Sequence, residues 1–393
     1  MRAAVGWSTR PEAARAGKEA AENALARLPS ARSNLALVFA SSWFDQAALL
    51  QAVRAAVGPV PLMGGSTAGE ITAEGPRSHS CVVLLIASDE LVCSLGTGEG
   101  VDRDAREAGR QAAYMAVQGF HGRPRRGFLL FGDGLATNYG DAIRGIQEAL
   151  GTGSLIIGGL AGDDLRFAQT YQYAGDRVLT HTVTGVLIGG GARIGAGLEH
   201  GFAPISKPRR ITRARANVLY ELDRKPAASV YEEYFGPALV QQLHDQRLSR
   251  QRIAFPLGIQ VGESERWLLR NVLSLRDDGG LRCNGEMPEG EWLQLMIGSR
   301  EPALEAARSA AQQAIRSLNQ VAAVLLFDSA VRRTLLGPQH AAMEVGAIRQ
   351  VVGSAIPLAG CYTYGEQAPS GSAVSYGPTV IQTGSVLVIA LGT

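Results

Sequence analysis

The sequence has few of the features that mark secreted, membrane or disulfide-rich proteins. Its 393 residues contain only four cysteines, Cys81, Cys93, Cys283 and Cys361, and no two of them form a CxxC pair. We interpret them as reduced and mostly buried. No apolar run approaches the roughly 18 residues that span a bilayer, and the amino terminus lacks the apolar core of a signal peptide. We therefore expect a soluble protein of the cytoplasm with no membrane partner.

Charge and catalytic motifs are equally scarce. The formal net charge is +2, which gives no electrostatic reason to expect nucleic acid as a partner. The six histidines are scattered without metal-ligand spacing. There is no phosphate loop, no dinucleotide fingerprint and no Gly-x-Ser-x-Gly turn. The sequence therefore predicts no metal, no cofactor and no catalytic residue, and an enzyme stays possible but unsupported.

Glycine is abundant, at 48 residues. Glycines recur in three stretches of similar sequence. Pro61–Glu70 reads PLMGGSTAGE, and related stretches occupy Leu155–Asp164 and Pro357–Glu366. In each stretch an apolar run is followed by glycine, and the stretch ends in Gly-Glu or Gly-Asp-Asp. We interpret each as a strand running into a glycine turn, and three copies of one turn indicate three copies of one unit.

The flanking segments support a repeated unit. Each stretch is preceded by a short strand, an alanine-rich helix, a second apolar strand and a further helical pattern, and is followed by a last apolar strand. We therefore predict an α/β fold of three related strand-helix-strand-helix-strand-strand units that form mixed sheets covered by helices. The first strands are expected near Gly6–Ser8, Leu95–Gly98 and Met296–Ser299, and the alanine-rich helices over 11–28, 102–118 and 301–318.

A segment of about a hundred residues departs from this pattern. Residues 196–291 read as an insertion before the third unit, and they contain antiparallel strand patterns such as Trp267–Leu275. The basic run Lys207–Arg215 fits the exposed face of an edge strand better than an anion grip. We place one domain at 1–225, holding two tandem units and the start of the insertion, and a second at 226–393, holding the rest.

Polar residues follow the predicted parallel strands where those strands end. Carboxyl ends of parallel strands meet at one edge of a sheet, which is where ligands of open α/β sheets bind. Taken singly, each residue fits a helix cap or a tight turn. Taken together they predict a ligand site at the strand ends. The candidates are Ser41, Ser66, Thr67, Glu70, Asp133, Asp163, Asp164, Asp328, Ser329, Arg332, Tyr362, Tyr364 and Glu366.

These residue types suit a small ligand with an amine and a carboxylate. Arg332 and nearby helix N-termini would take the carboxylate, although Arg332 also fits a simple pair with Asp328. On this hypothesis, replacing Arg332 or Glu366 with alanine abolishes binding without unfolding the chain. The other roles are an ammonium partner in Glu366 or Asp163, walls in Tyr362 and Tyr364, and hydrogen bonds from Ser66 and Thr67.

The same residues resemble the FIST family, a sensory domain of bacterial signal transduction with amino-terminal and carboxy-terminal parts. The resemblance covers nearly the whole chain. It implies a small-ligand sensor, with amino acids proposed as ligands for the family. The supporting stretches are Gly64–Glu70, Gly158–Asp164, Gly201–Pro204, Asn217–Asp223, Phe255–Gly258, Phe327–Arg332 and Gly360–Glu366.

Two departures from the family shape the functional prediction. The family often has cysteine where this chain has Ser329, so a hydroxyl replaces a thiol there. The chain also shows no attached kinase, cyclase or transmembrane module, so we expect a signal to pass through an unidentified signalling partner. The alternatives are an enzyme of the hydrolase or transferase type at the same strand ends, and a protein-interaction scaffold that uses the insertion.

Overall fold

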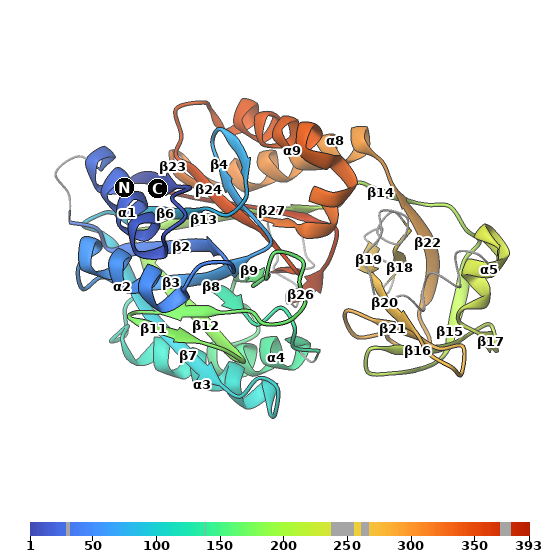
Figure 1. The fold of residues 1–393 in the computed structure, drawn as a ribbon. Coiled ribbons are helices and arrows are strands. Elements are labelled where there is room, and N and C mark those ends of the chain that lie inside the picture. The colour runs from blue at the N-terminus through green and yellow to red at the C-terminus, as the bar shows by residue number, and fades with distance from the viewer. Residues whose placement is uncertain (29–31, 138, 237–254, 261–266, 370–378) are drawn as a thin grey trace.

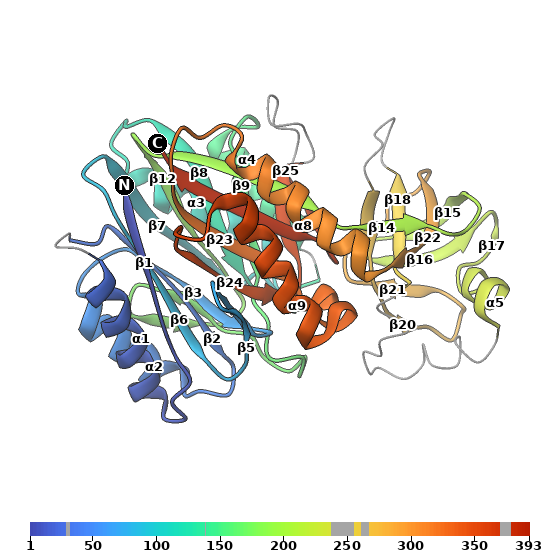
Figure 2. The same ribbon diagram turned by 90° about the horizontal axis from the view of Figure 1, so that it is seen from above.

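The computed structural model describes residues 1–28, 32–137, 139–236, 255–260, 267–369 and 379–393. An α/β body carries a separate lobe of antiparallel strands at one end (Figures 1 and 2). We call the described residues 200–298 the insertion lobe, and the remainder the body. Within the described residues the body contains three six-stranded mixed sheets with helices on their outer faces. The predicted α/β class with mixed, helix-covered sheets is confirmed.

The three sheets of the body share one strand order. In each, two central strands are parallel and the other pairings are antiparallel. The first sheet is β1 (Arg2–Ser8), β6 (Cys81–Ala87), β2 (Leu35–Ser41), β3 (Leu62–Thr67), β10 (Gln172–Ala174), β11 (Arg177–Leu179). The second is β7 (Leu91–Glu99), β12 (Thr182–Gly190), β8 (Arg125–Gly132), β9 (Ile156–Leu160), β25 (Glu366–Pro369), β26 (Thr379–Gln382). The third is β13 (Arg193–Glu199), β27 (Val386–Gly392), β23 (Val321–Ser329), β24 (Leu358–Thr363), β4 (Glu70–Thr72), β5 (Gly75–Arg77).

Each sheet is completed by a hairpin from another part of the chain. The hairpin β10–β11 extends the first sheet, β25–β26 extends the second, and β4–β5 extends the third. The sequence pattern did not reveal these hairpins, because strands of three or four residues are too short to show a clear period. The exchange ties the three sheets to one another.

The repeated glycines lie inside strands rather than in turns. A Cβ at Gly64, Gly158 or Gly360 would stand 1.8, 1.9 or 2.2 Å from a backbone oxygen of the parallel neighbouring strand. Those distances exclude any side chain, so glycine is required by close backbone approach. The predicted glycine turns are therefore corrected to strand residues of β3, β9 and β24.

The core lies where the three sheets face one another. Phe39, Phe131 and Phe327 occupy the middle strands β2, β8 and β23, and their ring centroids lie 5.6 to 5.8 Å apart. Pairs of helices cover the outer faces, and their alanines allow close packing: a Cβ at Gly98 would meet the Ala108 carbonyl oxygen at 1.8 Å. The pairs are α1 (Ala13–Arg27) with α2 (Gln46–Val57), α3 (Ala105–Gln118) with α4 (Tyr139–Leu150), and α8 (Arg300–Ile315) with α9 (Ala330–Val352).

The insertion lobe is built on a nine-stranded antiparallel sheet with a short helix, α5 (Ser229–Phe235). The third body sheet begins with β13, which precedes the lobe and pairs with β27. The segment Met296–Ser299, expected to open the third unit, instead belongs largely to the lobe strand β22, so that prediction is wrong. The strands are β14 (Phe202–Pro204), β15 (Arg209–Arg215), β16 (Val218–Leu222), β17 (Lys225–Pro226), β18 (Leu257–Gln260), β19 (Trp267–Arg270), β20 (Val272–Leu275), β21 (Leu281–Cys283) and β22 (Trp292–Gly298).

In the described part of the chain, no helix combines the length and apolar character that a bilayer crossing requires.

Candidate functional site

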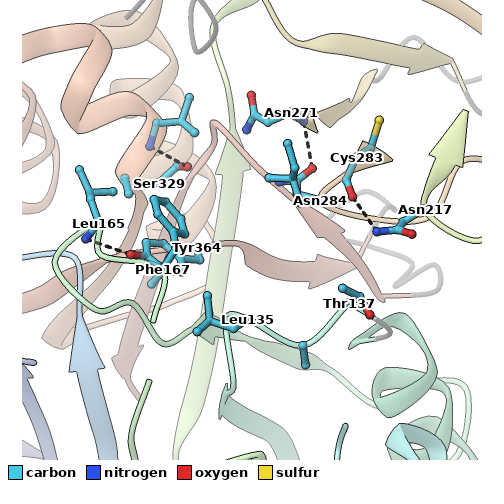
Figure 3. Close-up of a pocket in the computed structure, with 16 residues that line it drawn as sticks. Leu135, Thr137, Leu165, Phe167, Asn217, Asn271, Cys283, Asn284, Ser329 and Tyr364 are labelled. Atoms are coloured by element: carbon cyan, nitrogen blue, oxygen red, sulfur yellow. Dashed lines mark hydrogen bonds between the residues drawn. The ribbon is translucent and has the colours of Figure 1, made fainter. Parts of the chain in front are cut away.

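A cleft separates the body from the insertion lobe, and two adjoining cavities fill it. Figure 3 shows the residues that line one of them. The smaller has a volume of about 130 Å³ and the larger about 530 Å³. The body contributes the loop after β8, the start of α9 and the end of β24. Residues that line both cavities join them into one cleft. These shared residues are Gly134, Ala136, Thr137, Asn284 and Tyr364.

The body wall of the smaller cavity is apolar and rigidly supported. The ring of Tyr364 stacks on Phe167, with centroids 4.8 Å apart and an interplanar angle of 17°. The Tyr364 hydroxyl donates to Asp163 Oδ1 at 2.5 Å and accepts the Leu165 N–H at 2.9 Å. The Asp163 carboxylate also accepts three backbone N–H groups of residues 167–169. These bonds hold Leu165 and Phe167 at φ 63° and 52°, a conformation uncommon for large side chains.

The lobe wall of the same cavity carries amide side chains. Asn284 Oδ1 accepts the Asn271 N–H at 2.9 Å, and Asn217 Nδ2 donates to the Cys283 carbonyl at 2.9 Å. Asn271 is 5% exposed, and its Oδ1 has no hydrogen-bond partner within the described residues. A buried amide oxygen without a partner costs free energy, so this wall has unmet hydrogen-bonding capacity.

Charged groups enter the cleft only in the larger cavity, as far as the described residues show. Arg144 and Glu286 line it and form a half-exposed ion pair. Arg270 lines it too but is 5% exposed, and its described bonds go to backbone carbonyls: Nε to Glu286, and Nη1 to Leu269 and Ile381, at 2.9 to 3.0 Å. Burial lowers the pKa of Arg270 to about 10, so it stays charged at neutral pH.

Two of the predicted site residues, Ser329 and Tyr364, line the cleft. Ser329 begins α9, and its Oγ accepts the N–H groups of Val331 and Gly384 at 3.3 and 3.0 Å. Asp163 acts on the cleft through Tyr364 and the loop that it fixes. The other predicted residues line neither cavity.

Arg332 lies in the neck between body and lobe rather than in the cleft. It is fully buried, pairs with Asp328 at 3.2 Å and with Glu344, and donates to the carbonyls of His200 and Ala303 at 2.6 and 2.8 Å. His200 lies where the chain passes from β13 into the lobe, and Ala303 lies in the first turn of the body helix α8, just after the chain leaves the lobe strand β22. Burial and the Glu344 charge raise the pKa of Asp328 well above its usual range. The role predicted for Arg332 as a ligand anchor does not fit this burial, and the alternative pairing with Asp328 is observed.

Glu70 and Glu366 form two equivalent buried clamps. Glu70 accepts the hydroxyls of Thr67 and Ser80 at 2.5 Å each. Glu366 accepts those of Thr363 and Ser385 at 2.6 Å each. Burial raises the pKa of Glu70 to about 7 and that of Glu366 to about 8. Both are fully buried and line neither cavity, so the predicted ammonium role of Glu366 does not fit.

Two further contacts join the first and second units. Asp164 accepts the Ser41 hydroxyl at 2.8 Å, and the Ser66 hydroxyl donates to the Gly162 carbonyl at 2.7 Å. Ser41 and Ser66 are fully buried. These residues therefore hold the two units together, a role that neither the ligand-site prediction nor the cap-and-turn alternative included.

The last two predicted residues are also buried away from the cleft. Asp133 accepts the Thr170 hydroxyl at 2.7 Å and the Leu135 N–H at 2.9 Å. Tyr362 is fully buried, and the guanidinium of Arg333 lies 4.9 Å from its ring centroid. Of the two predicted tyrosine walls, Tyr364 alone is among the cleft-lining residues.

The sequence interpretation missed the lobe side of the cleft. Arg270 and Asn271 stand side by side within the otherwise apolar strand pattern Trp267–Leu275. That interruption was the available signal. It did not suffice, because nothing local indicates that Asn284 lies beside Asn271 or that the body wall lies opposite.

Comparison with known proteins supplies a family for this architecture. The FIST N domain model matches residues 34–225, and the FIST C domain model matches residues 227–369. An uncharacterized protein of Mycobacterium tuberculosis is 27% identical over 94% of this chain and 95% of its own length. An uncharacterized protein of Methanocaldococcus jannaschii is 32% identical over 44% of this chain, and the match spans about a third (34%) of that relative's length.

Similar solved structures include a cyanuric acid hydrolase from A. caulinodans, at 11% identity and a TM-score of 0.35, covering 100% of this chain and 99% of that one. Another is T. maritima PurL complexed with ADP, at 10% identity and a TM-score of 0.23, covering 99% of this chain and 71% of that one. Neither likeness bears on the chemistry of the cleft.

Proposed function

The chain belongs to the FIST family, and from this premise we propose that it is a sensory protein whose ligand binds in the cleft between body and insertion lobe. FIST domains are in general small-ligand sensory domains of signalling proteins. The ligand proposed is an amino acid or a similar small polar metabolite. The proposal includes a cytoplasmic setting and a signalling partner that reads the ligand-bound state.

The observation that carries the proposal is the cleft itself. It combines an apolar wall, a few polar groups and a position at the carboxyl ends of β8, β23 and β24, which are common features of small-molecule sites. Its walls come from two parts of the chain. A ligand that touches both would favour one relative arrangement of body and lobe, which a partner could read.

The cleft chemistry favours binding over catalysis. Cys283 lines the smaller cavity, but burial raises its pKa to about 12, so the nucleophilic thiolate is scarce at neutral pH. The Ser329 hydroxyl is occupied as an acceptor by two N–H groups. Among the described lining residues of both cavities there is no histidine or lysine to act as its base.

A thermal-shift screen of the purified chain against the common amino acids tests the proposal. A ligand at a hundredfold its dissociation constant stabilises the fold by about 2.7 kcal/mol. Thr137→Trp places a large ring in both cavities from an exposed position, and Thr152→Trp adds the same ring on an exposed turn after α4. We expect the shift in the wild type and Thr152→Trp, and its loss in Thr137→Trp. An equal shift in all three would place the ligand elsewhere, and mass spectrometry of the recovered ligand would expose turnover.

A further inference from the structure

Arg270 is a buried cation that lacks a negative partner in the described structure. It forms no ion pair with a described carboxylate, and three backbone carbonyls account for its described hydrogen bonds through Nε and Nη1. Within the described residues Nη2 donates no hydrogen bond, although a guanidinium offers two N–H groups there. The Glu286 charge acts on Arg270 only without direct contact, and a buried charge whose direct contacts are neutral dipoles favours an anion when one can reach it.

The three carbonyls also fix the direction of the guanidinium. Leu269 and Glu286 belong to the lobe, whereas Ile381 belongs to the body strand β26. The head group is therefore held from both sides of the cleft, at the wall of the larger cavity. A guanidinium held in one orientation loses little entropy when it binds a carboxylate.

The smaller cavity suits an uncharged ring. Its volume of about 130 Å³ is close to the roughly 150 Å³ of an engineered apolar cavity that binds benzene. Tyr364 and Phe167 supply aromatic surface, and no described lining residue is Asp, Glu, Lys, Arg or His. Asn271 and Asn284 line it from the lobe, so one side of the cavity carries amide side chains.

We propose that the cleft binds a small aromatic acid, with its ring in the smaller cavity against Tyr364 and its carboxylate on Arg270. This inference rests on the proposed function, which it narrows from small polar metabolites to ring-bearing acids. Tyr364 and Asn284 line both cavities, so one molecule can extend from the ring site into the larger space. The two N–H groups on Nη2 have no described acceptor, so a carboxylate oxygen can accept a hydrogen bond there, whereas a phosphate dianion would need further donors.

Matched ligand pairs test the charge. Phenylacetate, 3-phenylpropionate and indole-3-acetate would be compared with their carboxamides by calorimetry on the full chain. Phenethylamine, L-phenylalanine and phenyl phosphate complete the set. We expect at least one acid to bind at least tenfold more tightly than its carboxamide, because a charge-assisted pair replaces a neutral hydrogen bond. We expect phenethylamine to bind more weakly still.

Two variants assign the preference to this site. Arg270→Gln removes the charge, and Asn284→Asp adds an opposing charge beside both cavities while retaining the acceptor for the Asn271 N–H. Both should reduce the acid-to-carboxamide ratio to within about threefold of unity. Asn34→Asp is the matched control, since Asn34 Oδ1 likewise accepts one backbone N–H, from Ser88, far from the cleft. If Arg270→Gln fails to fold, Asn284→Asp carries the test.

Equal binding of acids and carboxamides by the wild type would overturn the inference. So would a full acid preference in a folded Arg270→Gln or Asn284→Asp variant, or preferred binding of phenyl phosphate. Suppose that an amino acid binds the wild type but not Thr137→Trp, and that no ring-bearing acid binds. The aromatic-acid inference is then wrong, while the proposed function stands. If neither group binds, both fall.

Discussion

Two buried arginines of this chain lie in contrasting surroundings. Arg332, in the neck, is enclosed by Asp328 and Glu344 and by two backbone carbonyls. Arg270, in the cleft, has backbone carbonyls as its described partners and no described carboxylate. Charge that is matched inside the protein serves the fold, whereas charge left unmatched at a cavity wall is available to a ligand.

Two buried carboxylates extend this comparison. Glu70 and Glu366 accept hydrogen bonds from hydroxyl and backbone N–H groups, much as Arg270 donates to carbonyls. Their raised pKa values, about 7 and about 8, let them bind a proton near neutral pH and lose their charge. Arg270, at about 10, cannot lose its charge in that range. The cleft therefore retains a permanent positive charge.

The largest expected effect comes from breaking the matched site. Arg332→Met keeps most of the side-chain volume but leaves Glu344 buried without its cation, so the free energy of unfolding should fall by about 3–5 kcal/mol. Urea denaturation measures it. Arg308→Met, at an exposed pair with Glu305, should change stability by less than about 1 kcal/mol. Adding Glu344→Gln to Arg332→Met should recover part of the loss. If Arg332→Met lowered the free energy of unfolding by as little as Arg308→Met does, Arg332 would not stabilise the neck.

The next effect is a pH dependence from the two clamps. The folded pKa values of Glu70 and Glu366 lie above the model value of 4.5, so the folded state binds more protons than the unfolded state between pH 4.5 and about 8. Their contribution is fully present below pH 4.5 and is lost as pH rises through 7 to 8. Over this window the stability contribution should fall by roughly 3 kcal/mol for Glu70 and roughly 5 kcal/mol for Glu366.

Glu70→Gln and Glu366→Gln mimic the protonated clamps and should each flatten the decline in stability measured by denaturation from pH 5 to 9. Glu74→Gln, at an exposed ion pair with Arg77, is the control and should leave the slope unchanged. Wild-type stability that rises across this range, with slopes unaltered by the two clamp variants, would contradict the raised pKa values.

Replacing Arg270, which has no described carboxylate partner, should lower the free energy of unfolding less than replacing Arg332. Arg270→Gln loses bonds to carbonyls, but it also removes a buried charge that forms no direct ion pair with a described carboxylate. These effects oppose each other, so we expect a loss of about 1–2 kcal/mol in urea denaturation. Arg144→Gln, at the half-exposed pair with Glu286, should lose less than about 1 kcal/mol. A loss from Arg270→Gln that equals that from Arg332→Met would erase the distinction between the two arginines.

The sequence predicted the parts of this molecule that depend on local pattern. Alanine-rich helices and apolar strands follow from spacing along the chain, but the position of the repeated glycines inside β3, β9 and β24 does not. Strand exchange between sheets did not, because β4 and β10 pair with strands distant in sequence. Arg332 was chosen as a ligand anchor for its nearness to Asp328, and that nearness is what encloses it. The sequence does not single out Arg270, because the carbonyl groups that surround its guanidinium come from Ile381 and Glu286, which lie further along the chain.

The smallest effect concerns the wall opposite Arg270. Tyr364→Phe keeps the ring that stacks on Phe167 but removes the hydroxyl bonded to Asp163 and Leu165, so stability should fall by about 1 kcal/mol. Amide hydrogen exchange should rise over residues 165–169, whose loop the hydroxyl helps to fix. Tyr234→Phe, which loses a hydroxyl that accepts the Lys207 N–H at 3.0 Å in the insertion lobe, is the control and should leave exchange over 165–169 unchanged. Equal exchange in both variants would mean that Asp163 alone holds the loop, and that the Tyr364 hydroxyl is free to meet the ligand.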